Sequence, residues 1–206
     1  MKTKLQQIYD EFAETYSENR GLFDMTEILD HFYGYLDTKK GELLDLGCGA
    51  GEPVAKWFID RGWTVTGVDF SNRMLDLASK YVPEMKTIHA DMSHIEFDKN
   101  RFDAITVIYS LFHIQSNSHS DLFNKFYHWL RPNGKVLFTY AVKEHTGNRE
   151  FDGYKNFMGR NLYYSHTEPD KLYMILEKIG FNIESADYRD SGNEGGIFLW
   201  VTMSKP

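Results

Sequence analysis

Three glycines at alternate positions, Gly47, Gly49 and Gly51, carry the clearest chemical signal in this sequence. They follow a short apolar run that contains Asp45, and a helical segment comes after them. Glycine permits a positive φ and lets a ligand approach the backbone closely, and the start of a helix offers N–H groups without partners. Asp69 stands at the end of the next apolar run, where a carboxylate can accept hydrogen bonds from both hydroxyls of a ribose. The pattern therefore predicts a site for a ligand that contains a nucleoside.

Two other nucleotide sites use glycine-rich turns, and the sequence fits neither. A dinucleotide site requires G-x-G-x-x-G, but Glu52 occupies the position of the third glycine. A Walker loop requires G-x-x-x-x-G-K-[ST], which does not occur in the chain. Acidic side chains at Asp45 and Glu52 would also repel a pyrophosphate, whereas they suit a ligand with an amine and a cationic centre. The alternative of a tight turn that binds nothing stays open, although three spaced glycines weaken a fold unless something requires them.

The glycine segment, Leu43–Gly51, resembles motif I of the class I S-adenosylmethionine-dependent methyltransferases. Four later segments resemble the further motifs of that family, in its order and spacing: Thr66–Ser71, His89–Met92, Arg101–His113 and Leu130–Val136. Together these motifs cover about residues 40 to 142. The last part of the chain is similar to that of small bacterial members whose substrate is unassigned. By these motifs the chain is identified as a member of the family.

The resemblance implies an α/β fold, a Rossmann-like three-layer sandwich with a seven-stranded, mostly parallel sheet and an antiparallel last strand. It also implies S-adenosylmethionine as the cofactor. In the family's pattern the glycines lie along the methionine part of the cofactor, Asp69 holds the ribose, and Asp91 accepts from the adenine amino group. The positions implied for cofactor binding are Tyr16, Asp45, Gly47, Cys48, Gly49, Gly51, Asp69, Phe70, Asp91, Met92 and Ser110.

Two histidines are candidates for the chemistry. Methyl transfer from a sulfonium is an in-line displacement on an activated carbon, so the protein mainly aligns two reactants and excludes water. A general base is needed only where the nucleophile must lose a proton. His113 and His166 could serve as that base or contact the substrate. Alternatively, His113 hydrogen-bonds a neighbouring loop, and His166 lies at the entry to a helix. The other histidines are scattered, so no metal site is expected.

Alternating strands and helices must position these residues. Apolar residues at three- and four-residue spacing predict two opening helices, Leu5–Tyr16 and Thr26–Leu36. Strands then alternate with helices through short connections, which indicates a parallel sheet. The expected strands are Glu42–Leu46, Trp63–Val68, Met85–His89, Phe102–Tyr109, Lys135–Val142, Phe181–Tyr188 and Gly196–Met203, the last two as a hairpin-related pair. The other expected helices are one with Pro53 in its first turn, Ser71–Lys80, Ser118–Leu130 and Glu168–Ile179.

We expect one domain over residues 1–206. Its parts are an N-terminal helical lid (1–38), a cofactor-binding core (40–142), an insertion or lid (143–166), and a C-terminal helix and strand pair (167–206). The insertion shows no clear periodicity, and long loops of this kind tend to be lids or binding segments. Aromatic residues, 16% of the chain, are prominent in the insertion and the N-terminal helices. They would either enclose an apolar, aromatic or amine acceptor or simply form the core of the lid.

The amino-acid composition limits the classes of molecule that this protein is expected to bind. The 23 basic and 30 acidic residues give a net charge of −7, which disfavours a nucleic-acid surface. The run after the fourth strand, Tyr109-Ser110-Leu111-Phe112, also differs from the Asn-Pro-Pro-Tyr of many enzymes that methylate DNA bases. The single cysteine excludes an internal disulfide, and neither a signal peptide nor a membrane span is recognisable. These features predict a cytoplasmic protein without membrane contact.

The expected function is transfer of a methyl group from S-adenosylmethionine to a small-molecule acceptor, at an O, N, C or S atom. One alternative is a catalytically silent protein that binds the cofactor or a partner. Another is a nicotinamide-dependent oxidoreductase, which the misplaced third glycine disfavours. A protein or RNA methyltransferase is a further alternative, against which the acidic composition and the lack of a substrate-docking domain count.

Overall fold

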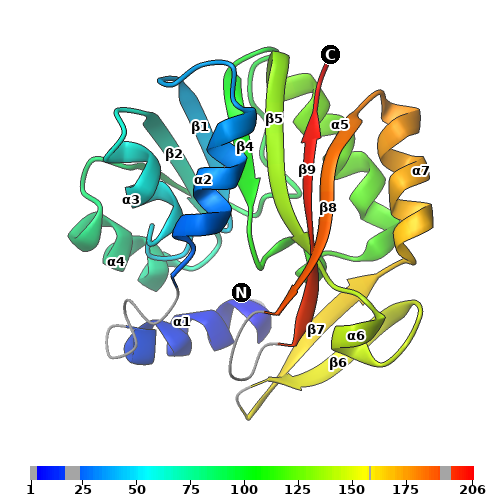
Figure 1. The fold of residues 1–206 in the computed structure, drawn as a ribbon. Coiled ribbons are helices and arrows are strands. Elements are labelled where there is room, and N and C mark those ends of the chain that lie inside the picture. The colour runs from blue at the N-terminus through cyan, green and yellow to red at the C-terminus, as the bar shows by residue number, and fades with distance from the viewer. Residues whose placement is uncertain (1–3, 17–23, 158, 191–195) are drawn as a thin grey trace. The chain divides into compact units, whose positions relative to one another are not determined.

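The computed structural model describes residues 4–16, 24–157, 159–190 and 196–206, whose fold is shown in Figure 1. Seven strands form one mostly parallel sheet flanked by helices. Their order is β3 (Lys86–His89), β2 (Thr64–Asp69), β1 (Glu42–Leu46), β4 (Phe102–Val107), β5 (Leu130–Tyr140), β9 (Ile197–Ser204) and β8 (Asn182–Asp190). β9 is antiparallel to both β5 and β8. The expected α/β class and the antiparallel last strand are thereby confirmed.

The first of two compact units comprises residues 1–95 and 102–106 and is built around β1. This strand pairs in parallel with β2 on one side and β4 on the other. Leu43, Leu44 and Leu46 are fully buried, as expected for a strand covered on both faces. The helices of this unit are α1 (Lys4–Tyr16), α2 (Thr26–Tyr35), α3 (Val54–Ile59) and α4 (Asn72–Tyr81). The glycine turn begins directly after this buried strand.

The second unit comprises residues 96–101 and 107–206. Its helical elements are η1 (Leu111–His113), η2 (Ser116–Ser118), α5 (His119–Trp129), α6 (Lys143–Thr146) and α7 (Pro169–Ile179). The predicted boundary between α5 and β5 was wrong, because β5 begins at Leu130 and not at Lys135. Leu130 already has extended backbone angles, and the carbonyl of Gly134 accepts a hydrogen bond of 2.9 Å from Lys205 N. The segment before Lys135 therefore continues the strand instead of forming a separate loop.

The expectation of an irregular insertion was also wrong. Residues 143–166 contain α6 and a separate two-stranded antiparallel sheet of β6 (Phe151–Phe157) and β7 (Arg160–His166). Gly159, with φ of 76°, lies between the strands. Tyr154 and Tyr163 are paired across the ladder, and their rings meet edge to face at 5.8 Å. Aromatic residues favour strands, and such cross-strand pairs stabilise a hairpin.

Most other predicted elements agree with the structure. Ser71 begins α4 as its N-cap, since its Oγ accepts a hydrogen bond of 3.2 Å from Met74 N. Gly180 ends α7 with φ of 112°, the left-handed conformation expected of a C-terminal glycine. β4 ends at Val107, short of the predicted Tyr109, and Tyr109 itself has φ of 52°. Among the described residues, no helix has the length and apolar character needed to cross a membrane.

Candidate functional site

The glycine turn after β1 depends on left-handed backbone conformations. Gly47, Gly49 and Gly51 have φ of 73°, 52° and 81°. A residue with a Cβ would be strained by about 1–2 kcal/mol at each such position. The N–H groups of Gly47 and Cys48 both donate to Val68 O, at 2.8 and 3.1 Å, which ties the turn to β2. These two hydrogen bonds therefore hold the turn at the end of β1 against the end of β2.

The glycines differ in what surrounds them. A Cβ at Gly51 would meet Val82 and Met85 at 3.0–3.1 Å, so this position is closed by packing. A Cβ at Gly49 would meet nothing within 4 Å. The backbone at Gly49 therefore faces open space, which is what close approach of a ligand requires.

Asp69 joins the turns that follow β1 and β2. Its Oδ2 accepts from Gly49 N at 2.9 Å and its Oδ1 accepts from Ser71 N at 2.8 Å. The side chain is buried, and this burial raises the pKa of Asp69 although the backbone hydrogen bonds oppose the shift. Each carboxylate oxygen has a second lone pair. The carboxylate is thus held in a fixed orientation with acceptor capacity to spare.

Asp45 is a buried carboxyl without a cation beside it. Its exposed fraction is 3%, and Thr106 Oγ1 donates a hydrogen bond of 2.7 Å to Oδ1. Burial raises the pKa of Asp45 to about 7, and the negative charge of Asp69 adds to the rise. No ion pair to Asp45 occurs within the part of the chain that the structure describes. Such a carboxyl favours a ligand that brings a positive charge.

Helix α1 contacts the loop that carries Asp69. The Oγ of Ser71 donates a hydrogen bond of 2.6 Å to Asp10 Oδ1, and both residues are buried. Gln6 Nε2 donates to Phe70 O at 2.6 Å, and the Tyr9 ring meets the Phe70 ring edge to face at 5.5 Å. Sequence reasoning missed Gln6 and Asp10. Neither residue lies on the apolar face formed by Leu5, Ile8, Tyr9, Phe12 and Tyr16, so no local pattern marks them.

The other expected cofactor positions in the first unit differ in their surroundings. Asp91, just after β3, is exposed, and its Oδ1 accepts from the N–H and the hydroxyl of Ser93 at 2.8 and 2.5 Å. Met92, the next residue in the sequence, is buried. Burial raises the pKa of the Cys48 thiol well above its usual range, so this thiol stays protonated and is not a nucleophile. Tyr16 ends α1, and its side chain lies outside the described residues.

Ser110 and His113 belong to the second unit. Tyr109, in its left-handed conformation, donates its N–H to Thr139 Oγ1 at 2.6 Å and places Ser110 at the start of η1. The Nδ1 of His113 lies 2.6 Å from Tyr163 O. A carbonyl can only accept, so Nδ1 carries the proton and Nε2 of the neutral ring is an acceptor. Burial lowers the pKa of His113 to about 4, which keeps the ring neutral near pH 7.

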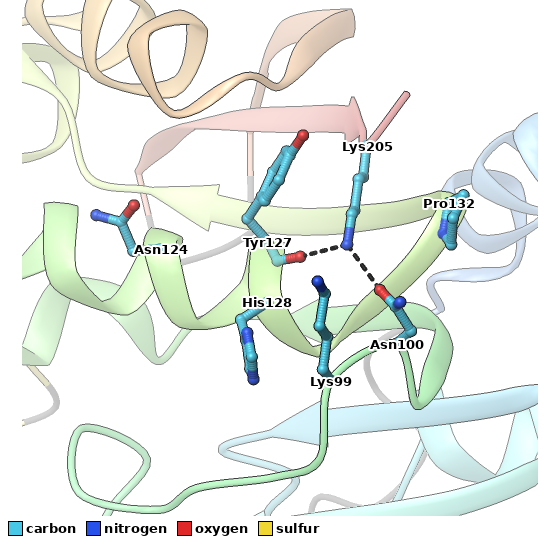
Figure 2. A pocket seen from close by; sticks show the side chains of 7 residues that line it. All are labelled: Lys99, Asn100, Asn124, Tyr127, His128, Pro132 and Lys205. Atoms are coloured by element: carbon cyan, nitrogen blue, oxygen red, sulfur yellow. Dashed lines mark hydrogen bonds between the residues drawn. The ribbon is translucent and has the colours of Figure 1, made fainter.

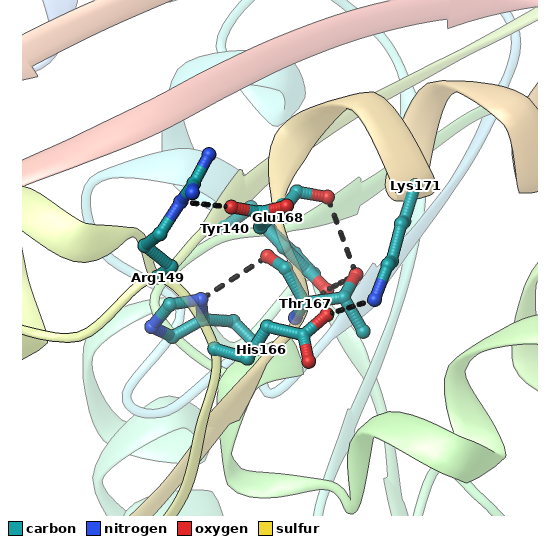
Figure 3. A network of polar contacts seen from close by, with 7 residues as sticks. Tyr140, Arg149, His166, Thr167, Glu168 and Lys171 are labelled. Atoms are coloured by element: carbon teal, nitrogen blue, oxygen red, sulfur yellow. Dashed lines mark hydrogen bonds and ion pairs between the residues drawn. The ribbon is translucent and has the colours of Figure 1, made fainter.

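His166 lies in a polar network that connects β7 with α7 (Figure 3). Its Nδ1 donates to Thr167 O at 3.1 Å, and its Nε2 is 2.8 Å from the hydroxyl of Thr146. Thr167 N donates to the hydroxyl of Tyr140 at 2.9 Å, and ion pairs join Arg149 to Glu168 and Lys171 to Glu150. Both ring nitrogens of His166 are engaged and its exposed fraction is 1%. These contacts anchor the hairpin, and a catalytic role for His166 stays a prediction.

An aromatic cluster lies in the second unit where η1, β7 and β9 meet. Phe112 stacks on Tyr164 at 5.1 Å and on Phe198 at 5.2 Å. Tyr109 contacts both Phe198 and Trp200 edge to face, at 5.3 and 5.5 Å. The ring of His113 lies 5.1 Å from that of Tyr164. His113 is therefore surrounded by aromatic faces as well as fixed by its hydrogen bond.

The chain is similar to known proteins in sequence and in fold. A family model described as a methyltransferase domain matches residues 43–134. The chain is 32% identical to phosphoethanolamine N-methyltransferase 3 of Arabidopsis thaliana, over 74% of this chain and 31% of that protein, and it spans about a third of the length of such plant relatives. It is 31% identical to demethylmenaquinone methyltransferase of Lactobacillus johnsonii, over 73% of this chain and 72% of that protein. The crystal structure of an S-adenosylmethionine-dependent methyltransferase from Mesorhizobium loti matches with a TM-score of 0.70 at 19% identity, over 85% of this chain and 96% of that one.

Proposed function

The chain belongs to the class I S-adenosylmethionine-dependent methyltransferases, and we propose that it methylates a small-molecule acceptor. The observation that carries the proposal is the pairing of an open glycine turn with two buried carboxyls. The turn leaves Gly49 uncovered, and the buried carboxyls of Asp45 and Asp69 lie beside it with no ion pair to either one from the described residues. This set of groups suits a nucleoside ligand that carries an amine.

The residues present fit the cofactor of the family. The buried carboxyl of Asp45 would pair with the amine of the methionine part, which supplies the missing positive charge. The spare lone pairs of Asp69 would accept from the ribose hydroxyls. Phe70, Asp91 and Met92 would contact the adenine, and Gly47 to Gly51 would lie along the methionine part. Tyr16 and Ser110 complete the proposed set from α1 and from the start of η1.

When bound, S-adenosylmethionine supplies a methyl group activated by its attachment to a sulfonium. The protein then has to align the acceptor and exclude water. In this proposal His113 contacts the acceptor, and its neutral ring carries the proton on Nδ1, which donates to Tyr163 O. A neutral imidazole in an aromatic surrounding can orient the nucleophile, whereas a pKa of about 4 makes His113 a weak base. His166 is the second candidate, and each of its ring nitrogens has a hydrogen-bond partner.

Two observations support a small acceptor over a macromolecule. The relatives named above act, by their names, on phosphoethanolamine and demethylmenaquinone, which are both small molecules. The net charge of −7 would repel the phosphates of a nucleic acid. The aromatic cluster around Phe112 would provide apolar faces for an apolar or amine acceptor.

Calorimetric titration with S-adenosylhomocysteine tests the cofactor site. Asp69→Ala removes an acceptor of two hydroxyls and is expected to weaken binding by about 10- to 100-fold, since hydrogen bonds to charged groups contribute about 1.5–3 kcal/mol. The matched control is Asp76→Ala, which removes an exposed carboxylate of α4 in the same unit and should leave the affinity unchanged. Equal affinities for the two variants would remove Asp69 from the site.

Turnover separates an enzyme from a silent binder. The wild-type protein is incubated with S-adenosylmethionine and a panel of amines, phenols and quinols, and release of S-adenosylhomocysteine is measured. We expect release above the acceptor-free level with at least one small molecule, and its loss in Asp69→Ala. Tight cofactor binding without release for any acceptor would favour the silent alternative.

A further inference from the structure

A cavity of about 480 Å³ lies in the second unit, away from the aromatic cluster (Figure 2). Its walls come from the loop before β4, the last turns of α5, the start of β5 and the residue after β9. The lining residues are Lys99, Asn100, Asn124, Tyr127, His128, Pro132 and Lys205. β5 and β9 run antiparallel, with Lys135 opposite Ser204 and Tyr140 opposite Leu199. The cavity is therefore at one end of this strand pair and Phe198, with the aromatic cluster, at the other.

Lys205 places a buried positive charge in the wall of this cavity. Its exposed fraction is 7%, and its Nζ donates to Asn100 Oδ1, Tyr127 O and Leu130 O at 2.9, 2.8 and 2.7 Å. These three oxygens use all three ammonium protons, and none of them belongs to a carboxylate. Burial lowers the pKa of Lys205, and the nearby charge of Lys99 lowers it further. The charge of Lys205 is thus solvated by dipoles but is not neutralised.

The other ionisable residues that line the cavity are also of basic type. Lys99 and His128 are exposed at its wall, and no aspartate or glutamate is among the lining residues. Of the acids in the preceding loop, Glu96 forms an ion pair of 2.6 Å with Lys125, and Asp98 is exposed next to Lys99. The carbonyls at the end of α5 would attract cations, but Lys205 already satisfies two of them. The whole chain has a net charge of −7, so a cavity lined by basic residues without acidic ones differs from the rest of the protein.

We propose that this cavity binds the phosphate group of a small phosphorylated molecule. Lys99 Nζ would contact the phosphate directly, with the amide nitrogen of Asn100 as a further donor. Lys205 holds the carbonyl side of the Asn100 amide, which leaves its Nδ2 with two N–H groups for the phosphate. A dianion would neutralise the paired charges of Lys99 and Lys205. The volume lies within the range of about 300–1,000 Å³ found for small-molecule sites, so an organic group fits beside the phosphate.

The experiment measures the thermal midpoint and calorimetric affinity of the full chain with inorganic phosphate and with glycerol phosphate. Sodium chloride at the same ionic strength is the reference. We expect both phosphates to raise the midpoint above the chloride value. Lys99→Gln should weaken binding at least tenfold, because it removes the cation that would contact the phosphate. His128→Gln should weaken it several-fold through the loss of a second basic lining residue. Both side chains are exposed, so both variants are expected to fold like the wild type.

Lys178→Gln is the matched control, since it removes one exposed lysine charge from α7 outside the cavity. This variant should bind phosphate like the wild-type protein. The proposal is overturned if phosphate has no effect beyond chloride, or if Lys99→Gln and Lys178→Gln lose affinity equally. A response to glycerol phosphate that exceeds the response to inorganic phosphate would identify an organic phosphate as the occupant, and equal responses would identify the free ion.

Discussion

At the scale of single residues, the environment of each acid determines its chemistry. Asp91 is exposed and bonded to Ser93, whereas Asp45 and Asp69 are buried with raised pKa values. For a carboxyl, burial disfavours the charged form unless a cation or several donors compensate. Asp69 has two backbone donors, and Asp45 has one hydroxyl. Asp45 is therefore the group whose protonation a bound amine would change most.

Asp45 leads to a prediction about protons. Its pKa of about 7 in the ligand-free protein means that the carboxyl is mostly protonated at pH 6. A bound ammonium favours the carboxylate, so binding S-adenosylhomocysteine at pH 6 should release close to one proton, and above pH 8 it should release none. Calorimetry in buffers of different ionisation enthalpy measures this release. Asp45→Asn should show none at either pH, and release from that variant equal to that of the wild type would contradict the assignment.

The same group should affect stability. Its pKa rises from the ordinary aspartate value of 3.8 to about 7 in the folded protein, so the folded state binds the proton more tightly than the unfolded state. The stabilisation is therefore fully present below about pH 4 and is lost as the pH rises to 7, with an upper limit of about 4 kcal/mol. Chemical unfolding of the ligand-free protein at several pH values should show this decline, and it should be absent in Asp45→Asn.

At the scale of elements, α1 presents one face to the loop after β2. Gln6, Tyr9 and Asp10 are three and four residues apart along the helix, and all contact Phe70 or Ser71. The hydroxyl of Ser71 has two tasks, because it caps α4 and donates to Asp10. The position of α1 is thus linked to the orientation of the loop that holds Asp69.

Asp10→Ala should expose this link. It leaves the buried hydroxyl of Ser71 without its acceptor, which costs about 1–3 kcal/mol of folding free energy. We also expect weaker binding of S-adenosylhomocysteine, as a rise in KM for S-adenosylmethionine with little change in kcat. Asp10→Asn keeps an acceptor oxygen and should restore most of the affinity. The control is Gln7→Ala on the exposed face of α1, and identical affinities for Asp10→Ala and Gln7→Ala would show that α1 does not position the loop.

The limits of sequence prediction also lie at this scale. The strand β1 and the caps of α4 and α7 follow from local signals, namely apolar runs, Ser71 and Gly180. The hairpin of β6 and β7 was missed because its two runs mix aromatic and polar residues without a strict alternation. The contact between Asp10 and Ser71 joins positions 61 residues apart, and no local pattern specifies such a pair. Family motifs located the glycine turn and the acids, whereas the contacts that support them form only in the folded chain.

At the scale of the whole molecule, ligand binding should stabilise the fold by mass action. At 100 times its dissociation constant, S-adenosylhomocysteine should add about 2.7 kcal/mol to the free energy of unfolding. For a chain of 206 residues this corresponds to a rise of about 5–10 °C in the thermal midpoint. Reduced nicotinamide dinucleotide is the comparison ligand and should produce no shift. A shift with the nicotinamide alone would support the oxidoreductase alternative instead.

The position of β9 has a consequence for how the chain acquires its structure. This strand follows β5 and β8 in sequence order but lies between them, and its pairing with β5 joins Lys135 to Ser204. Until β9 is in place, β5 and β8 each lack a neighbour, and unpaired strand edges are prone to join other chains. Closing such distant pairs is slow, because the loop entropy is lost before the contacts form. During synthesis this half of the sheet therefore depends on β9 for its cohesion, and aggregation competes with folding most strongly just before that strand emerges.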